Sequence, residues 1–193
     1  LASVIYLFGM AFPQRLSTAF KIMFPLGIIS ALIATYLITC SPQIIFLLDK
    51  LPESFIHRVY IWKNVIALIT EKPWFGWGMD SSAIISNFKA NILQFNSGET
   101  WSLLSHHPHH LLLQPLLEIG IVGTAFYLLT IYIIFIEILK TPLVPKVRNV
   151  FITVTASYFT VAFSSFSLWA SWWIAAFLMA IYFVKLESVG SKS

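Results

Sequence analysis

The stretch IGIVGTAFYLLTIYIIFI, residues 119–136, contains no charged side chain and directly follows Glu118. A helix needs about 20 mainly apolar residues to cross the hydrocarbon core of a bilayer. We therefore expect a membrane span at about 119–136. Residues 22–40 are also free of charge, and they predict a second span.

The C-terminal part of the chain contains a longer uncharged segment, residues 150–184. This segment exceeds the length of one ordinary span and suits two short ones. We expect these spans at about 150–165 and 168–184, joined near the serines at 164–165. Such a hairpin returns the chain to the side of the membrane from which it entered.

The composition agrees with a membrane protein. The hydrophobic fraction is 58%, the charged fraction is 10%, and the mean hydropathy is +0.82. These values exclude an ordinary soluble domain. Because apolar residues 1–12 are too short to span a bilayer, we interpret residues 1–193 as the C-terminal part of a single multi-pass membrane domain with further helices upstream. The predicted fold class is all-α, a polytopic transmembrane helical protein.

Lysine and arginine fall into three groups that orient the predicted spans. Cytoplasmic loops of membrane proteins collect these residues. The spans put all three groups on one side, which we assign to the cytoplasm. The groups are Arg15 with Lys21, then Lys140, Lys146 and Arg148, and finally Lys185 with Lys192. Residues 41–110 then form a long extracytoplasmic loop.

This loop contains periodic sequence that predicts two amphipathic helices, at about 56–71 and from an Asp80–Ser81 cap to Phe95. The apolar positions are Val59, Trp62, Val65, Ile66 and Ile69 in the first helix and Ile84, Ile85, Phe88, Ile92 and Phe95 in the second. The aromatic turn Pro73–Gly78 separates them. We expect both helices to lie on the membrane surface or across the mouth of a cavity.

Four histidines precede the span at 119–136, in Ser105-His106-His107-Pro108-His109-His110. One hypothesis is a metal site, although adjacent histidines do not converge on one ion as spaced ligands do. A second is a helix cap at the membrane interface, with Pro108 at the first helical position. A third is a transporter or channel that uses the histidines as proton carriers, which the uncharged later spans disfavour.

A polar stripe continues from the histidines into the apolar sequence. On a helix, His110, Gln114 and Glu118 share one face. Polar side chains at this depth are costly unless they line a cavity or pair internally, so they indicate a functional region. Pro115 suits only the first turn or a kink, so we expect the regular helix to begin near Leu112.

Two groups of residues together resemble the signature of the O-antigen ligase and polymerase family of membrane glycosyltransferases. His109-His110 is followed, after nine residues, by Gly120-Ile121-Val122-Gly123, which overlaps Glu118-Ile119-Gly120. In the family a histidine, most often followed by asparagine, stands at this distance before Gly-x-x-Gly. The segments Arg58–Trp62 and Pro73–Gly78 are similar to its Arg-x-x-x-Trp and Pro-x-x-Gly-x-Gly elements at the start of a large periplasmic loop.

The resemblance implies a multi-pass protein of the bacterial inner membrane that moves a glycan from a polyprenyl diphosphate carrier to a lipid A-core or other glycan acceptor. O-antigen polymerase and protein O-oligosaccharyltransferase remain alternatives within the family. Diphosphate is a good leaving group, so the enzyme must deprotonate the acceptor and hold the negative charge of the carrier. We expect a one-step attack that inverts the anomeric carbon and needs neither metal nor cofactor.

The resemblance also implies which residues perform these tasks. Histidine has an unperturbed pKa of about 6.5, so its neutral form serves as a general base, and the match selects His109. Arg58 is the candidate for the diphosphate, because a guanidinium makes two parallel hydrogen bonds to phosphate oxygens. The expected supporting or substrate-binding residues are His107, His110, Glu118, Trp62, Gly120 and Gly123. Trp74 and Trp77 are candidates for stacking on sugars or for anchoring at the interface.

Overall fold

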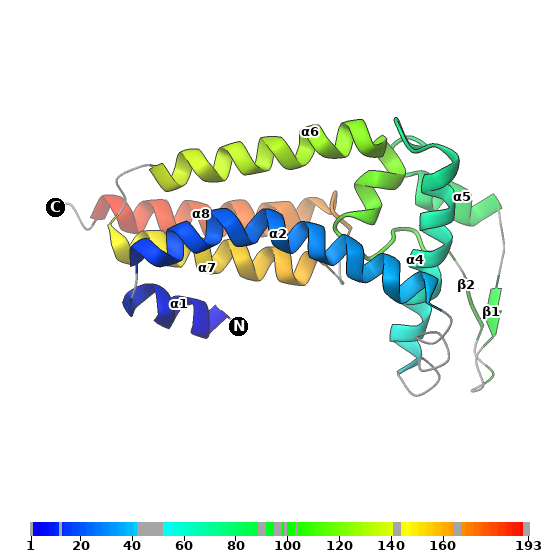
Figure 1. Ribbon diagram of the computed structural model, residues 1–193, viewed down its shortest axis with the longest axis horizontal. Coiled ribbons are helices and arrows are strands. Elements are labelled where there is room, and N and C mark those ends of the chain that lie inside the picture. Colours follow the sequence, from blue (N-terminus) through cyan, green and yellow to red (C-terminus); the bar gives the residue numbers. More distant parts are fainter. Residues whose placement is uncertain are drawn as a thin grey trace.

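The computed structural model describes residues 2–11, 13–41, 52–88, 92–94, 98, 100–102, 104–140, 144–163 and 167–190. This part of the chain is mostly helical, as the sequence predicts (Figure 1). The helices are α1 (Ala2–Ala11), α2 (Pro13–Cys40), α4 (Glu53–Glu71), α5 (Ser81–Phe88), α6 (Leu113–Lys140), α7 (Pro145–Ala162) and α8 (Ser171–Gly190). Two short strands, β1 (Ile92–Gln94) and β2 (Thr100–Ser102), form an antiparallel ribbon.

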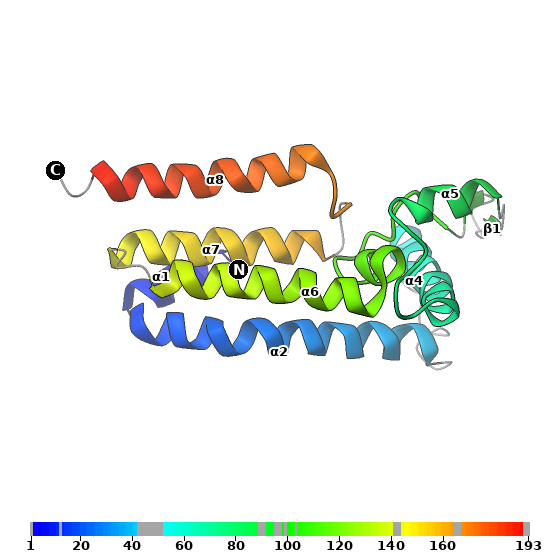
Figure 2. The same ribbon diagram turned by 90° about the horizontal axis from the view of Figure 1, so that it is seen from above.

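The elements divide into a bundle of long helices and a group of shorter elements at one end. Helices α2, α6, α7 and α8 lie lengthwise beside one another, and α1 packs against α7 (Figures 1 and 2). Helices α4 and α5 and the two strands gather at one end of this bundle, and α4 runs across its long axis. The segment before α6, which carries the histidines, reaches the bundle at the same end.

Two of the long helices are long and apolar enough to cross a membrane. The first qualifying segment, Thr18–Cys40 in α2, contains the span expected at 22–40. The second, Leu113–Lys140 in α6, contains the span expected at 119–136. Many of their large apolar side chains are exposed, which fits contact with lipid better than the core of a soluble protein. These side chains include Ile22, Met23, Leu26, Ile29 and Ile33 of α2, and Phe126, Leu129, Ile133 and Ile134 of α6.

Helices α7 and α8 occupy the region of the predicted hairpin. The expected segments 150–165 and 168–184 overlap Pro145–Ala162 and Ser171–Gly190. The apolar part of α8, Ser171–Phe183, is shorter than a full span within the residues that the structure describes. The crossing of the membrane by this pair stays a prediction.

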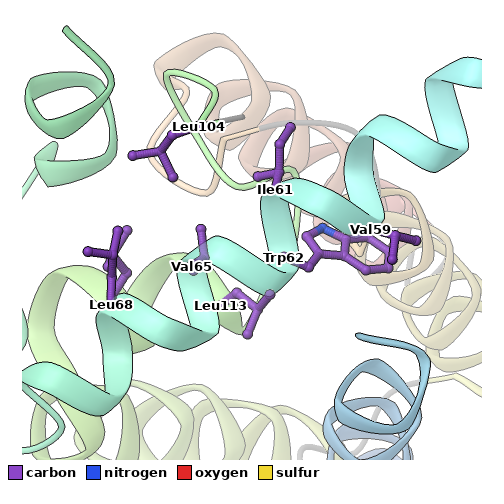
Figure 3. Close-up of a cluster of buried hydrophobic side chains, with 8 residues drawn as sticks. Val59, Ile61, Trp62, Val65, Leu68, Leu104 and Leu113 are labelled. Carbon is purple, nitrogen blue, oxygen red and sulfur yellow. The ribbon is translucent and has the colours of Figure 1, made fainter. Parts of the chain in front are cut away.

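Helix α4 matches the first loop helix predicted from the sequence. Its buried face consists of Val59, Ile61, Trp62, Val65 and Leu68. These side chains pack against Leu104 before the histidines and against Leu113 and Leu117 of α6 (Figure 3). Full burial of such a side chain contributes about 1.5–3 kcal/mol, so this cluster fixes α4 beside the start of α6.

The prediction of a second loop helix as far as Phe95 is wrong beyond Phe88. Helix α5 ends at Phe88, and Ile92–Gln94 pairs with Thr100–Ser102 as β1 and β2. The apolar spacing fits a helix, but pairing with β2 satisfies the backbone of this segment instead, and tertiary contacts of this kind override local periodicity. Phe95 itself lies outside the described residues.

Helix α6 contains a sharp break at Gly120. The helix begins at Leu113, one residue from the expected start, and Pro115 lies in its first turn, where a missing N–H does no harm. Gly120 has φ 67° and ψ −172°, a conformation that is essentially confined to glycine. The break separates a short, mostly buried segment, residues 113–119, from the remainder of the helix, which exposes many large apolar side chains.

Candidate functional site

The imidazole of His110 caps the N-terminus of α6. Its Nδ1 accepts hydrogen bonds from the N–H groups of Leu112 and Leu113, both at 3.2 Å, and its carbonyl accepts the N–H of Gln114. Side-chain acceptors at this position satisfy N–H groups that have no partner within the helix. A histidine therefore caps the helix, but it is His110, and the first helical position is Leu113 and not Pro108. The location of this cap at a membrane interface stays a prediction.

His110 is also the most enclosed of the histidines in the cluster. Its Nε2 lies 2.9 Å from Oγ1 of Thr35 on α2, and its ring meets Trp62 and Phe163 edge to face. Burial lowers the pKa of His110 from 6.5 to about 4. The ring is consequently neutral at physiological pH.

His109, the predicted base, has a left-handed backbone with φ 51°, which is uncommon for a residue other than glycine. Its Nε2 lies 3.5 Å from Oγ of Ser105, and its ring centroid is 4.1 Å from that of His107. The ring is half-buried, whereas His106 is exposed. His109 thus has one face supported by its neighbours and retains access to solvent.

His107 lies beside the ring of His109 in the cluster. Burial, followed by the charges of His109 and His106, lowers the pKa of His107 to about 4. The imidazole of His107 is therefore neutral at physiological pH.

Trp62 connects α4 to the histidine segment. Its indole Nε1–H donates to the carbonyl of Pro108 at 3.0 Å, and Pro108 directly precedes His109. Arg58 is half-buried and lies one turn before Trp62, so the two side chains share a helix face. The structure thus brings the face of α4 that carries Arg58 and Trp62 to the segment that carries His109.

Two glycines allow the aromatic turn at Pro73–Gly78 to form backbone hydrogen bonds on both sides of the break in α6, an arrangement that we call the clasp. Backbone N–H groups of Trp77 and Gly78 donate to the carbonyls of Leu117 and Glu118 at 2.8 and 2.9 Å. In return, the N–H groups of Ile121 and Val122 donate to the carbonyls of Pro73 and Trp74. These four bonds join the Pro-x-x-Gly-x-Gly element to the Glu-x-Gly-x-x-Gly element.

The clasp leaves no room for a side chain at its centre. A Cβ on Gly76 would lie 2.6 Å from the carbonyl carbon of Glu118, and a Cβ on Gly120 would lie 2.5 Å from the nitrogen of Phe75. Gly123 has a different surrounding, because a Cβ there would meet the side chain of Ile119 at 2.7 Å. Gly120 therefore permits backbone contact, while Gly123 makes room for a side chain of its own helix.

Trp74 and Trp77 have different surroundings in this turn. The indole of Trp77 donates to the carbonyl of Leu68 at 2.8 Å, and the ammonium of Lys72 lies 4.0 Å from its ring centroid. Trp74 is exposed, and its carbonyl accepts the N–H of Val122 in α6. Trp77 thus anchors the turn to α4, and Trp74 stays a candidate for contact with lipid or sugar.

Glu118 belongs to a buried polar network between α6 and the segment after α7. Its carboxylate accepts hydrogen bonds from the amide of Gln114 and from the indole N–H of Trp169. The carbonyl oxygen of Gln114 accepts the N–H of Leu168 at 2.8 Å, and its amide donates to Ser167. The polar stripe therefore pairs internally: the carboxylate of Glu118 is bonded by Gln114, by Trp169 and also by the backbone of Asp80.

The sequence did not single out three residues that contribute to this region. Thr35, Ser105 and Trp169 supply the partners of His110, His109 and Glu118. Thr35 lies 75 positions before His110, and nothing distinguishes it in sequence from the other small polar residues of its span. Among the described residues there is no group of three or more His, Cys, Asp or Glu side chains that could hold a metal ion.

The low pKa of His110 predicts that stability falls as the solution becomes more acidic. In the unfolded chain this histidine takes up a proton near pH 6.5, but in the folded protein only near pH 4. The unfolded state therefore binds more protons between these values, and the free energy of unfolding decreases by about 3 kcal/mol as the pH is lowered through this window. Thermal unfolding of wild type and His110→Asn between pH 7 and pH 4 measures this, and equal pH dependence in both proteins would contradict it.

Removal of the Glu118 carboxylate is expected to destabilise the protein. Glu118→Ala leaves the buried N–H groups of Trp169 and Gln114 without their acceptor, and each such loss costs about 1–3 kcal/mol. Glu118→Gln retains one acceptor oxygen, so its melting temperature should lie between those of wild type and Glu118→Ala. A melting temperature of Glu118→Ala equal to that of the wild type would show that the network contributes nothing to the stability of the fold.

Comparisons with known proteins identify the family of this chain. The family model described as O-antigen ligase matches residues 1–128. A protein of Rickettsia conorii named "Putative polysaccharide ligase" is 30% identical over 133 residues, and one of Rickettsia felis with the same description is 31% identical over 133 residues. Each alignment covers 69% of this chain and 32% of the relative, so the chain spans about a third of the length of these proteins. No solved structure gives a significant match.

The matched region contains α4, the aromatic turn, the histidine segment and the break at Gly120. The chain therefore belongs to the O-antigen ligase family.

Proposed function

We propose that the full-length protein is a glycosyltransferase that moves a glycan from a polyprenyl diphosphate carrier to a lipid A-core sugar or another glycan. The reaction takes place at the periplasmic face of the bacterial inner membrane, which the protein crosses several times. O-antigen polymerase and protein O-oligosaccharyltransferase activities differ from this one only in the acceptor.

In the proposed reaction, the imidazole of His109 removes the proton from the acceptor hydroxyl. The resulting oxygen nucleophile attacks the anomeric carbon of the donor glycan, and the bond between that carbon and the diphosphate oxygen breaks. The carrier leaves as polyprenyl diphosphate, and the attack from the opposite face inverts the configuration. A positioned general base contributes about a hundredfold to ten-thousandfold to such a step.

Arg58 has the proposed task of binding the diphosphate. Its guanidinium is always charged and matches two phosphate oxygens at once, so it offsets the charge that remains on the carrier. The position of Arg58 one turn before Trp62, whose indole bonds the histidine segment, supports this role.

The observation that carries the proposal is the hydrogen bond from Trp62 to the carbonyl of Pro108. It joins α4, which carries the arginine, to the segment that carries the base, although the two are 46 positions apart in sequence. A base and a permanent cation at one end of apolar helices suit a donor that has both a lipid tail and a diphosphate.

Reconstitution tests the proposed activity directly. Full-length protein in lipid nanodiscs is mixed with a polyprenyl diphosphate-linked oligosaccharide and a lipid A-core acceptor, and both the extended acceptor and free polyprenyl diphosphate are quantified. We expect the two products in equal amounts, with and without EDTA. Absence of acceptor extension with all glycan acceptors, or loss of activity in EDTA that zinc restores, would contradict the proposal.

Substitution of Arg58 is expected to weaken transfer much more than substitution of its neighbour Lys63. A charge-assisted hydrogen bond contributes about 1.5–3 kcal/mol, so Arg58→Ala should reduce kcat/KM by about tenfold to a hundredfold or more. Arg58→Lys keeps the charge but loses the paired geometry and should be intermediate. Lys63 is exposed on the same helix, and Lys63→Ala serves as the matched control. Equal losses for Arg58→Ala and Lys63→Ala would point to general surface charge instead.

A further inference from the structure

The hydrogen bonds of His110 show which of its two ring nitrogens carries the proton. Backbone N–H groups can only donate, so Nδ1, which receives those of Leu112 and Leu113, carries no proton. The neutral ring therefore has its proton on Nε2 and donates it to Oγ1 of Thr35. The hydroxyl of Thr35 in turn donates to the carbonyl of Ala31 at 2.8 Å.

Both nitrogens of His110 are thus occupied by the protein itself. To take a proton from a substrate, Nδ1 would have to release two backbone N–H groups at the buried start of α6. Only 3% of the residue is exposed, so solvent could not replace these bonds. The adjacent His109 differs in this respect, because it is half-buried and outside the cap.

The same ring joins four elements around the proposed base. It caps α6, bonds Thr35 of α2, and contacts Trp62 of α4 and Phe163 at the end of α7, with ring centroids 5.2 and 5.6 Å away. On the other side of His109, the carbonyl of Pro108 is held by the indole of Trp62. His109 is therefore fixed at both of its peptide neighbours.

This arrangement accounts for the backbone of His109. A left-handed conformation costs a residue other than glycine about 1–2 kcal/mol and persists when its surroundings determine it. We propose that His110 is a positioning residue: it holds His109 in the left-handed conformation that presents its imidazole, and it does not exchange protons with substrate. This inference rests on the role of His109 in the proposed function.

The chemistry of the cap selects a conservative replacement. The side-chain oxygen of asparagine accepts N–H groups at the start of a helix, and asparagine is among the preferred capping residues. His110→Asn should therefore preserve the cap while removing an imidazole. His110→Ala removes both, and Thr35→Val removes only the acceptor of the Nε2–H group.

A kinetic experiment with the full-length protein separates positioning from proton transfer. Transfer from the polyprenyl diphosphate-linked donor is measured per folded molecule, after size-exclusion chromatography. We expect His110→Asn to keep kcat and KM near wild-type values. His110→Ala should lower kcat by about tenfold to a hundredfold, as misplacement of a reacting group by about 1 Å does, with KM for the donor unchanged. Thr35→Val should have a smaller effect in the same direction.

Two kinetic results would overturn the inference. One is a loss in His110→Asn as large as that in a variant without His109, because an imidazole would then be needed at position 110. The other is wild-type kcat in His110→Ala, because the cap would then have no influence on His109.

Labelling with diethyl pyrocarbonate, followed by mass spectrometry, decides the question even if no transfer is detected and the proposed function fails. In the wild type, exposed His106 and half-buried His109 should react and His110 should not. The labelling rate of His109 should change in His110→Ala and stay near the wild-type rate in His110→Asn. Reaction of His110 as fast as His106, or equal His109 rates in all three proteins, would overturn the inference without reference to glycan transfer.

Discussion

Gly120→Ala is expected to abolish correct folding of the region that contains the histidines. The substitution places a Cβ against the carbonyl of Trp74 and the nitrogen of Phe75, both of which are backbone atoms. It also puts alanine in a conformation of φ 67° and ψ −172° that only glycine adopts readily. Overpacking costs about 1–3 kcal/mol or more, and the strained backbone costs about 1–3 kcal/mol in addition.

The sum of these penalties is a large part of the stability of a typical domain, about 5–15 kcal/mol. We therefore expect Gly120→Ala to lower the melting temperature sharply or to prevent recovery of folded protein. Size-exclusion chromatography and thermal unfolding in detergent measure both. Gly76→Ala should behave in the same way, because its Cβ would meet the backbone of Glu118 and Gly120.

Two other glycines provide matched controls. Gly78 has φ 100°, but a Cβ there would have nothing within 4 Å, so Gly78→Ala should carry only the backbone penalty. Gly27 lies in α2 with open space around it, and alanine there should be neutral or slightly stabilising, because alanine favours helices by about 1 kcal/mol over glycine. If all four variants unfolded at the same temperature, the clasp between the aromatic turn and α6 would not exist.

The sequence predicted those parts of the fold that depend on local chemistry. The uncharged segment before Glu137, the periodic apolar positions of α4 and the placement of Pro115 in a first turn each follow from the neighbouring residues. The length of α5 was mispredicted, because residues 92–94 pair with residues 100–102 as β1 and β2. The spacing of the apolar residues in so short a run does not distinguish a helix from such a hairpin.

The candidate site was likewise predicted only in part from the sequence. Spacing relative to Gly120 selected His109, but the cap formed by His110 depends on Thr35, which is distant in sequence. The family commonly has asparagine at the position of His110. Histidine can take this place because asparagine and a neutral imidazole both cap a helix. Glu118 was expected only as a supporting residue, and its partner Trp169 comes from the segment after α7, which is distant in sequence.

His109→Asn is expected to have the largest effect on the proposed reaction. Asparagine tolerates a left-handed backbone better than alanine does, so the φ of 51° at this position can be kept. It cannot act as a base near neutral pH. Loss of a general base reduces the rate by about a hundredfold to ten-thousandfold, and we expect a decrease in kcat within this range.

His106 provides the matched control for this substitution. It belongs to the same cluster but is exposed, and its position three residues earlier lies outside the pairing of His109 with His107 and Ser105. His106→Asn should therefore transfer glycan at nearly the wild-type rate. Melting temperatures of both variants establish whether a lost activity reflects lost structure.

The rate of glycan transfer by His109→Asn, measured with saturating polyprenyl diphosphate-linked donor in nanodiscs, tests the central claim most directly. We predict a folded protein whose kcat is at least about a hundredfold below that of wild type and His106→Asn. Transfer by folded His109→Asn at the wild-type rate would contradict the assignment of His109 as the base.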